Sequence, residues 1–121
     1  MTALLVSVAG SLGALARFVV DGAIRTRRAT EFPWATVVIN VTGSLLLGFL
    51  TGLVLYQGAP HSLQVVAGIG FCGGYTTFST ASAETVRLIQ RGRYRAAAVN
   101  ALGTLALTLA AAGAGLALAT L

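Results

Sequence analysis

The chain has 121 residues, of which 56% are hydrophobic and 9% are charged, and its mean hydropathy is +0.86. Soluble domains carry about 25% charged residues, so this composition excludes an ordinary soluble domain. The formal net charge is +5 at pH 7, yet no Asp, Glu, Lys or Arg occurs in 32–83 or in 96–121.

Four apolar segments, at about residues 3–24, 34–56, 63–88 and 96–119, account for nearly the whole chain. Each is long enough to cross the bilayer, which takes about 20 residues. They predict an all-α membrane protein with a single four-helix transmembrane domain over residues 1–121. No basic residue precedes the first segment, which favours a retained helix over a cleaved signal peptide.

The basic residues, all arginine, indicate the topology. Connections one and three hold most of them, whereas the second connection and both termini hold none. Since these two connections share a side, the positive-inside rule puts them in the cytoplasm and both termini outside, in a multi-pass protein of the cell (plasma) membrane. Topology explains the charge better than nucleic-acid binding does, so we expect a lipid bilayer and no nucleic acid as partner.

The first segment contains Gly10, Gly13 and Ala14 at a spacing that suits close helix contact. Arg17 and Asp21 are four residues apart and therefore share a face near the basic end. An ion pair between them is one interpretation, and a place for Arg17 at the mouth of a permeation path is the other.

The second segment places Thr36, Asn40 and Ser44 on one helical face, followed by the GxxxG pair of Gly48 and Gly52. An amide well inside a membrane span is costly unless it finds a partner or faces water. Asn40 therefore either joins two helices or lines a polar path.

The third segment is rich in glycines, which should weaken its helix, and a row of hydroxyl residues follows them. The predicted break is Gly73–Thr77, close to the bilayer midplane, and such a break needs protein or a water-filled cavity around it. Further on, Glu84 and Arg87 are spaced i to i+3 and predict an ion pair at the surface. The glycines are Gly68, Gly70, Gly73 and Gly74.

The fourth segment repeats the pattern of the second with Asn100, Thr104 and Thr108 on one face. A single threonine within a span usually bonds to its own backbone. Three polar positions on one face, matched by the stripe in the second segment, favour a shared polar path.

Signatures of catalysis are missing, because the chain has no HExxH, no CxxC and no phosphate-binding loop. We expect a transport protein and not an enzyme. A proton-coupled exporter of cations or drugs needs a carboxylate within the span, and the first segment has no acid before Asp21. Neutral amide and hydroxyl donors, with aromatic ring edges, instead favour a small anion.

The chain resembles the Fluc/CrcB family of fluoride channels over its whole length. Three stretches carry this resemblance. They are "GSLGALARF" from Gly10, "NVTGSLLLGFLTG" from Asn40 and "GGYTTFST" from Gly73. The resemblance implies an antiparallel, dual-topology dimer of four-helix subunits with two pores and a central structural sodium ion. It implies a channel through which cytoplasmic fluoride leaves down its electrochemical gradient, which reduces fluoride toxicity.

By position, the resemblance also implies roles for single residues. The backbone carbonyls of Gly73 and Thr76 would hold the sodium ion, Phe78 would face fluoride, and Arg17 would lie at the aqueous vestibule. The remaining residues of the expected fluoride path are Asn40, Thr77, Ser79, Asn100, Thr104 and Thr108.

One position departs from the family pattern. Where the family usually has a second phenylalanine, three residues after the first, this chain has Ala81. Together with the uneven arginines, this favours a fixed orientation and pairing with an oppositely oriented paralogue; a homodimer is the alternative. The other functions left open are a small four-helix cation or drug exporter and a non-conducting membrane assembly subunit.

Overall fold

The computed structural model describes residues 1–28 and 32–121, and the described chain is helical with no β-strand. Its long helices are α1 (Thr2–Arg27), α2 (Trp34–Tyr56) and α6 (Tyr94–Leu118). All three are long and apolar enough to cross a membrane. Between α2 and α6 lie α3 (His61–Leu63), the π-helix η1 (Gln64–Cys72), α4 (Gly73–Tyr75) and α5 (Phe78–Gln90).

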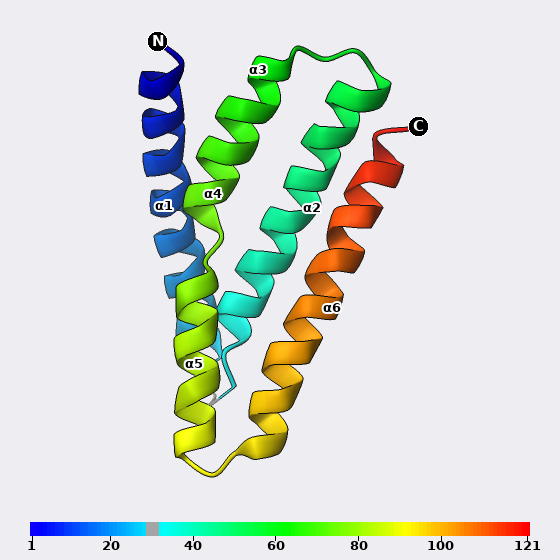
Figure 1. Ribbon diagram of the computed structural model, residues 1–121. Coiled ribbons are helices and arrows are strands. Elements are labelled where there is room, and N and C mark those ends of the chain that lie inside the picture. Colours follow the sequence, from blue (N-terminus) through cyan, green and yellow to red (C-terminus); the bar gives the residue numbers. More distant parts are fainter. Residues whose placement is uncertain (29–31) are drawn as a thin grey trace.

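The helices lie side by side along one long direction (Figure 1). The segment from α3 to α4 fills one half of that length and α5 fills the other half, so together they form one interrupted helical column. Along this column η1 and α4 pack on α1, α5 packs on α6, and α2 packs on α6. Both termini lie at the end of the molecule opposite the turn that joins α5 to α6.

The glycines of the third segment remain helical, so the expectation that they break the helix is wrong. Two of them, Gly70 and Gly74, serve close packing on α1: a Cβ on Gly74 would overlap the backbone of Gly10, because α4 crosses α1 at that point. The backbone of η1 is wound as a π-helix, with i to i+5 hydrogen bonds, along this contact.

The GxxxG pair of α2 faces α6. A Cβ on Gly48 would overlap the backbone of Ala112, and one on Gly52 would crowd Ala119. Small residues on both helices therefore let the backbones approach, as is common between helices in membranes.

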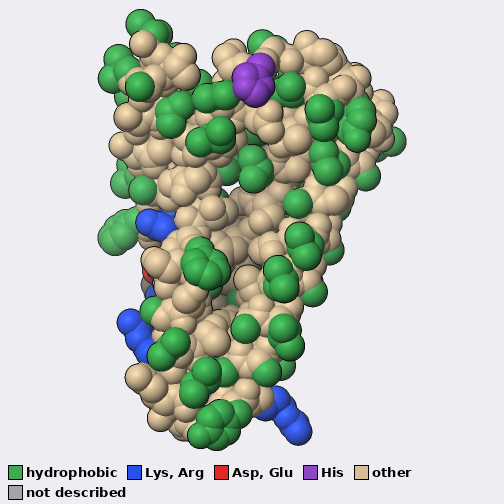
Figure 2. Space-filling view, in the orientation of Figure 1, with side chains coloured by type: hydrophobic (Ala, Val, Ile, Leu, Met, Phe, Trp, Pro, Cys, Tyr) green, Lys and Arg blue, Asp and Glu red, His purple; other side chains and the backbone are tan. Residues whose placement is uncertain are grey.

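Side chains are distributed as expected for a protein surrounded by lipid. Large apolar residues such as Leu12 and Phe18 are exposed along the helices. Apolar side chains are scattered over the visible face, which is hollowed near its middle; arginines lie in one half of the molecule and His61 at the end of the other (Figure 2).

Candidate functional site

The interrupted column is broken at two residues. Thr76 (φ −80°, ψ 161°) and Thr77 (φ −148°, ψ 122°) are both extended, between the end of α4 at Tyr75 and the start of α5 at Phe78. The break therefore lies at the carboxyl end of the range expected from sequence, after the glycines.

Asn40 of α2 holds this break together. Its Nδ2 donates to the carbonyl oxygen of Thr77 at 2.9 Å, and the backbone N–H of Thr77 donates to its Oδ1 at 2.9 Å. In an uninterrupted α-helix this N–H would bond to the carbonyl of Gly73. The buried amide of Asn40 thus replaces helical hydrogen bonds, and it also lines a cavity. The interpretation that Asn40 joins two segments is therefore confirmed, and its place on a polar path stays a prediction.

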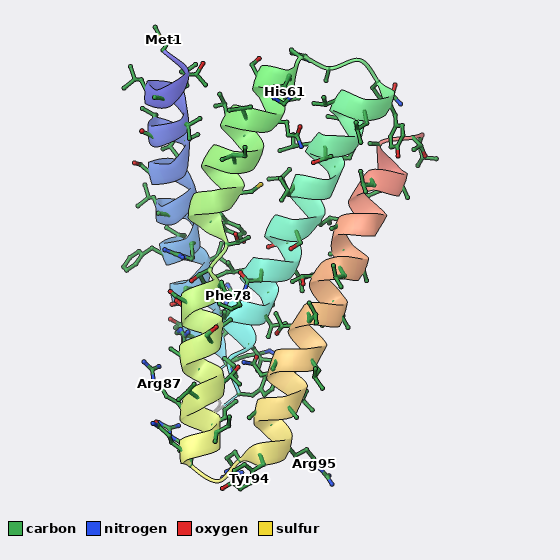
Figure 3. All side chains as sticks on the ribbon, in the orientation of Figure 1. Met1, His61, Phe78, Arg87, Tyr94 and Arg95 are labelled. Atoms are coloured by element: carbon green, nitrogen blue, oxygen red, sulfur yellow. The ribbon has the colours of Figure 1, made fainter. Side chains whose placement is uncertain are left out.

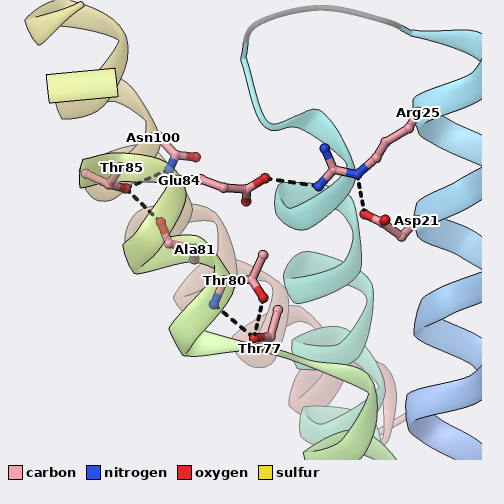
Figure 4. Close-up of polar contacts among 8 residues, drawn as sticks. All are labelled: Asp21, Arg25, Thr77, Thr80, Ala81, Glu84, Thr85 and Asn100. Carbon is pink, nitrogen blue, oxygen red and sulfur yellow. Dashed lines mark hydrogen bonds and ion pairs between the residues drawn. The ribbon is translucent and has the colours of Figure 1, made fainter. Parts of the chain in front are cut away.

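The hydroxyls beside the break bond locally. Thr77 caps α5, because its Oγ1 accepts a hydrogen bond of 3.2 Å from the backbone N–H of Thr80 (Figure 4). Thr76 Oγ1 donates to the carbonyl of Cys72 at 2.8 Å. The first bond satisfies a backbone N–H that the start of α5 would otherwise leave without a partner, whereas the Cys72 carbonyl also accepts from the Thr76 N–H at 2.9 Å.

A cavity of about 690 Å³ lies on the α2, α5 and α6 side of the break. Among the described residues that line it, none is charged. Its polar lining consists of amides, hydroxyls, the Cys72 thiol and the backbone. The polar side chains are those of Asn40, Ser44, Cys72, Thr76, Thr77, Ser82, Thr85, Asn100, Thr104 and Thr108.

The polar stripe of α6 lines this cavity, but its members have different partners. Asn100 is only 2% exposed and donates to Thr85 Oγ1 at 2.8 Å, which joins α6 to α5 (Figure 4). Thr108 donates to the carbonyl of Leu105 in its own helix. The hydroxyl of Thr104 is buried and has no hydrogen-bond partner within the described chain.

Phe78 and Ser79 begin α5 and are both exposed in this single subunit. Phe78, labelled in Figure 3, lines the large cavity, yet its residue surface is 87% exposed. Ser79 lines neither of the two cavities described here.

A second cavity, of about 310 Å³, lies between α1, α2 and the start of α5, and it is charged. Arg17, Asp21 and Arg25 line it together with Thr77, which also lines the large cavity. Nη1 of Arg17 donates to the carbonyl of Thr76 at a long 3.4 Å. The expected pairing of Arg17 with Asp21 is wrong, because Asp21 binds Arg25 at 2.8 Å.

Glu84 is not a surface residue, and its predicted pairing with Arg87 is also wrong. Its side chain is 9% exposed, and Oε2 accepts from Nη2 of Arg25 at 3.0 Å, while Oε1 is buried without a partner in the described chain (Figure 4). Because α5 packs with this face inward, Glu84 meets α1 instead of its helical neighbour. The i to i+3 spacing could not reveal this contact across 59 positions.

The break also exposes backbone oxygens. The Gly73 carbonyl has lost its bond from the Thr77 N–H, and nothing lies within 4 Å of a Cβ built on Gly73. Within the described residues, no group of three or more His, Cys, Asp or Glu could hold a metal. A cation at the break would therefore meet carbonyl oxygens, which suit hard cations. Two carbonyls from one subunit are too few, so the residues fit such an ion only with ligands from a second chain.

A helical, multi-pass membrane protein with an uncharged polar cavity beside a broken helix is a protein of the permeation class. Residues 4–116 match the family described as "CrcB-like protein, Camphor Resistance (CrcB)". The chain belongs to this family, whose relatives point to a channel and not to an enzyme.

Curated relatives are similar over nearly the whole chain. "Fluoride-specific ion channel FluC 1" of Leifsonia xyli is 52% identical over 116 residues, covering 96% of this chain and 85% of its own. The protein named "Fluoride-specific ion channel FluC 2" of Cutibacterium acnes is 47% identical, covering 98% and 97%. A further "Fluoride-specific ion channel FluC 1", of Symbiobacterium thermophilum, is 48% identical with the same coverage.

Proposed function

We propose that this protein is a fluoride-specific ion channel of the cell membrane, through which cytoplasmic fluoride leaves passively down its electrochemical gradient. The names of its relatives support this function. The observation in the structure that carries it is the cavity beside the break, whose polar lining consists of amides and hydroxyls and includes no charged residue among those described.

Thr104 adds a buried hydroxyl without a partner in the described chain, which costs about 1–3 kcal/mol unless a bound group accepts its hydrogen bond. Hydroxyl and amide donors can replace the water around a small anion, whereas a fully charged group would hold the anion too tightly to pass. The positive ring edge of Phe78 adds a further favourable contact. The same lining offers no carboxylate to exchange protons for cations, which argues against the exporter.

Thr77 lies on both cavities, so the break separates a charged chamber from an uncharged one. In the proposed path, Arg17 attracts the anion into the charged chamber. The anion then passes Thr77 and Asn40 and moves along Thr104 and Thr108. Asn100 supports this path by fixing α5 on α6.

The proposed assembly is an antiparallel dimer of subunits with four spans each, the interrupted column being the additional span. Two features of the single subunit support a partner. Phe78 is left 87% exposed, and one chain of 121 residues leaves a broken helix beside an incompletely covered cavity.

In that dimer, the carbonyls of Gly73 and Thr76 from both subunits would surround a sodium ion with four oxygens. The ion would supply a fixed positive charge that holds the two broken helices together. Half-helix ends with unwound carbonyls are a known way to coordinate sodium in membrane proteins.

The partner is an identical chain or an oppositely oriented paralogue. The arginines at one end favour a single orientation of this chain. Ala81 lines the large cavity, so the pore formed there lacks a second ring unless the partner provides one. Equal inside and outside populations of terminal tags on the chain expressed alone would contradict a fixed orientation.

The function is tested by fluoride efflux from liposomes that contain the purified chain, alone and with an oppositely oriented relative. We expect passive efflux that needs no proton gradient. Thr104→Val should lower the flux several-fold, because it removes the free hydroxyl while keeping the shape. Thr26→Val is the matched control, since the Thr26 hydroxyl bonds to its own helix at Gly22. Absence of flux in both preparations would favour the non-conducting assembly subunit.

A further inference from the structure

One end of the molecule carries positive charge that its own carboxylates do not balance. Asp21 and Glu84, the described acidic residues at this end, both bind Arg25. Arg25 thus takes up both negative charges.

Four of these arginines form what we call the basic collar. They come from the ends of α1 and α5 and from the start of α6, and all are exposed. No ion pair holds them within the described part of the chain. Arginine side chains project at this end (Figures 2 and 3). The members of the collar are Arg27, Arg28, Arg87 and Arg95.

The turn between α5 and α6 is rigid, so part of the collar is presented in a fixed arrangement. The Arg93 N–H bonds to the carbonyl of Leu88 at 2.8 Å and the Gly92 N–H to that of Ile89 at 3.0 Å. With Gly92 at φ 74°, these bonds form a Schellman motif. Arg87 and Arg95, on either side of this turn, are therefore carried by two well-defined helix ends.

Aromatic residues place the collar at the depth of lipid headgroups. Trp34 begins α2 and is 43% exposed, with the Phe32 ring 4.8 Å from its own. Tyr94, beside Arg95, is exposed as well (Figure 3). Tryptophan and tyrosine are enriched where the membrane meets water.

We propose that the basic collar binds the phosphate groups of anionic phospholipids. Guanidinium groups form paired hydrogen bonds with phosphate oxygens. A juxtamembrane basic cluster is also attracted to an anionic leaflet, by a factor of roughly five for each engaged arginine. The exposed apolar helix surfaces next to the collar accept the acyl chains of the same lipids. Free phosphate and nucleic acid have no acyl chains and lack this second contact.

Trp34 is the one tryptophan of the chain and therefore reports on this site. The full chain is reconstituted in symmetrical vesicles of zwitterionic lipid with increasing brominated phosphatidylglycerol, and separately with brominated phosphatidylcholine. Bromine quenches tryptophan at contact range. We expect brominated phosphatidylglycerol to quench Trp34 at a several-fold lower mole fraction than brominated phosphatidylcholine does.

Two double variants separate the two parts of the collar: Arg27→Gln with Arg28→Gln, and Arg87→Gln with Arg95→Gln. The first should abolish most of the preference for brominated phosphatidylglycerol in the quenching of Trp34, because these arginines shortly precede Trp34 in the chain. Tyr56→Trp with Trp34→Phe reports on the opposite end of α2, which has no arginine, and should show no preference. The symmetrical vesicles make the orientation of the chain irrelevant.

Equal quenching by the two lipids, or an unchanged preference in both double variants, would overturn the proposal. Displacement of the brominated phosphatidylglycerol by millimolar inorganic phosphate would overturn the choice of a lipid as ligand. None of these measurements involves fluoride, so they stand whether or not the proposed function does.

Discussion

The side-chain amide of Asn40 and the backbone of Thr77 exchange two hydrogen bonds of 2.9 Å each. Through them α2 fixes the extended residues that separate α4 from α5. The geometry of the break therefore depends on a residue of another helix and not on the broken segment alone.

Replacing Asn40 with leucine tests this clamp. Asn40→Leu leaves the buried N–H and C=O of Thr77 without partners, at a cost of about 1–3 kcal/mol for each group. We expect a clear fall in the midpoint of thermal unfolding in detergent and loss of fluoride flux. Ser44→Ala, one turn away in the same cavity, should leave the midpoint close to that of the parent. A parent-like midpoint for Asn40→Leu would contradict the clamp.

The helix cap at Thr77 predicts a smaller effect. Thr77→Ala removes the oxygen that accepts from the Thr80 N–H, and loss of such a cap costs about 1 kcal/mol. Thr77→Ser keeps the oxygen and should retain most of the stability. Denaturant unfolding of the two variants in detergent distinguishes them, and equal destabilisation would show that the methyl group matters more than the cap.

The contact between Arg25 and Glu84 predicts non-additive effects. Arg25→Gln leaves the buried Glu84 carboxylate without its ion pair, which we expect to cost about 1–2 kcal/mol, because Arg25 is half exposed and solvent screens the pair. Adding Glu84→Gln removes the buried charge, so the double variant should be less destabilised than the sum of the single ones.

Arg87→Gln is the control for that pair and should change stability by less than about 0.5 kcal/mol, as an exposed substitution. A larger effect of Arg87→Gln than of Arg25→Gln would mean that Glu84 pairs within α5 after all. Chemical unfolding in detergent measures the loss of stability caused by each of the two substitutions.

Two neighbouring glycines predict opposite outcomes for the same substitution. Gly74→Ala puts a methyl group into the backbone of Gly10, so α1 and α4 must separate, at a cost of about 1–3 kcal/mol for such overpacking. Gly73→Ala meets open space and should be close to neutral in stability. The midpoints of thermal unfolding of the two variants test this difference. Equal destabilisation would mean that backbone flexibility, and not close packing, sets the need for glycine here.

Much of the membrane architecture could be predicted from the sequence. Length and hydropathy predicted the helical segments, because both are properties of neighbouring residues along one helix. The segment of the break was also predicted, although Gly70 and Gly74 pack on α1 while two threonines form the break itself.

The partners of the polar side chains could not be predicted in the same way. Spacing suggested Arg17 with Asp21 and Glu84 with Arg87, but the structure pairs Arg25 with both acids. A helical spacing shows which residues share a face and not which helix that face meets.

The sequence by itself determined that this is a helical membrane protein with an arginine-rich end and uncharged polar stripes, because composition and helical periodicity are local properties. Only the tertiary structure decided that Asn40 clamps the break, that Thr104 has a buried hydroxyl without a partner in the described chain, and that the buried Glu84 pairs with Arg25 of α1. Each of these depends on two helices meeting at a particular rotation and depth, which is set by the packing of small residues between distant segments.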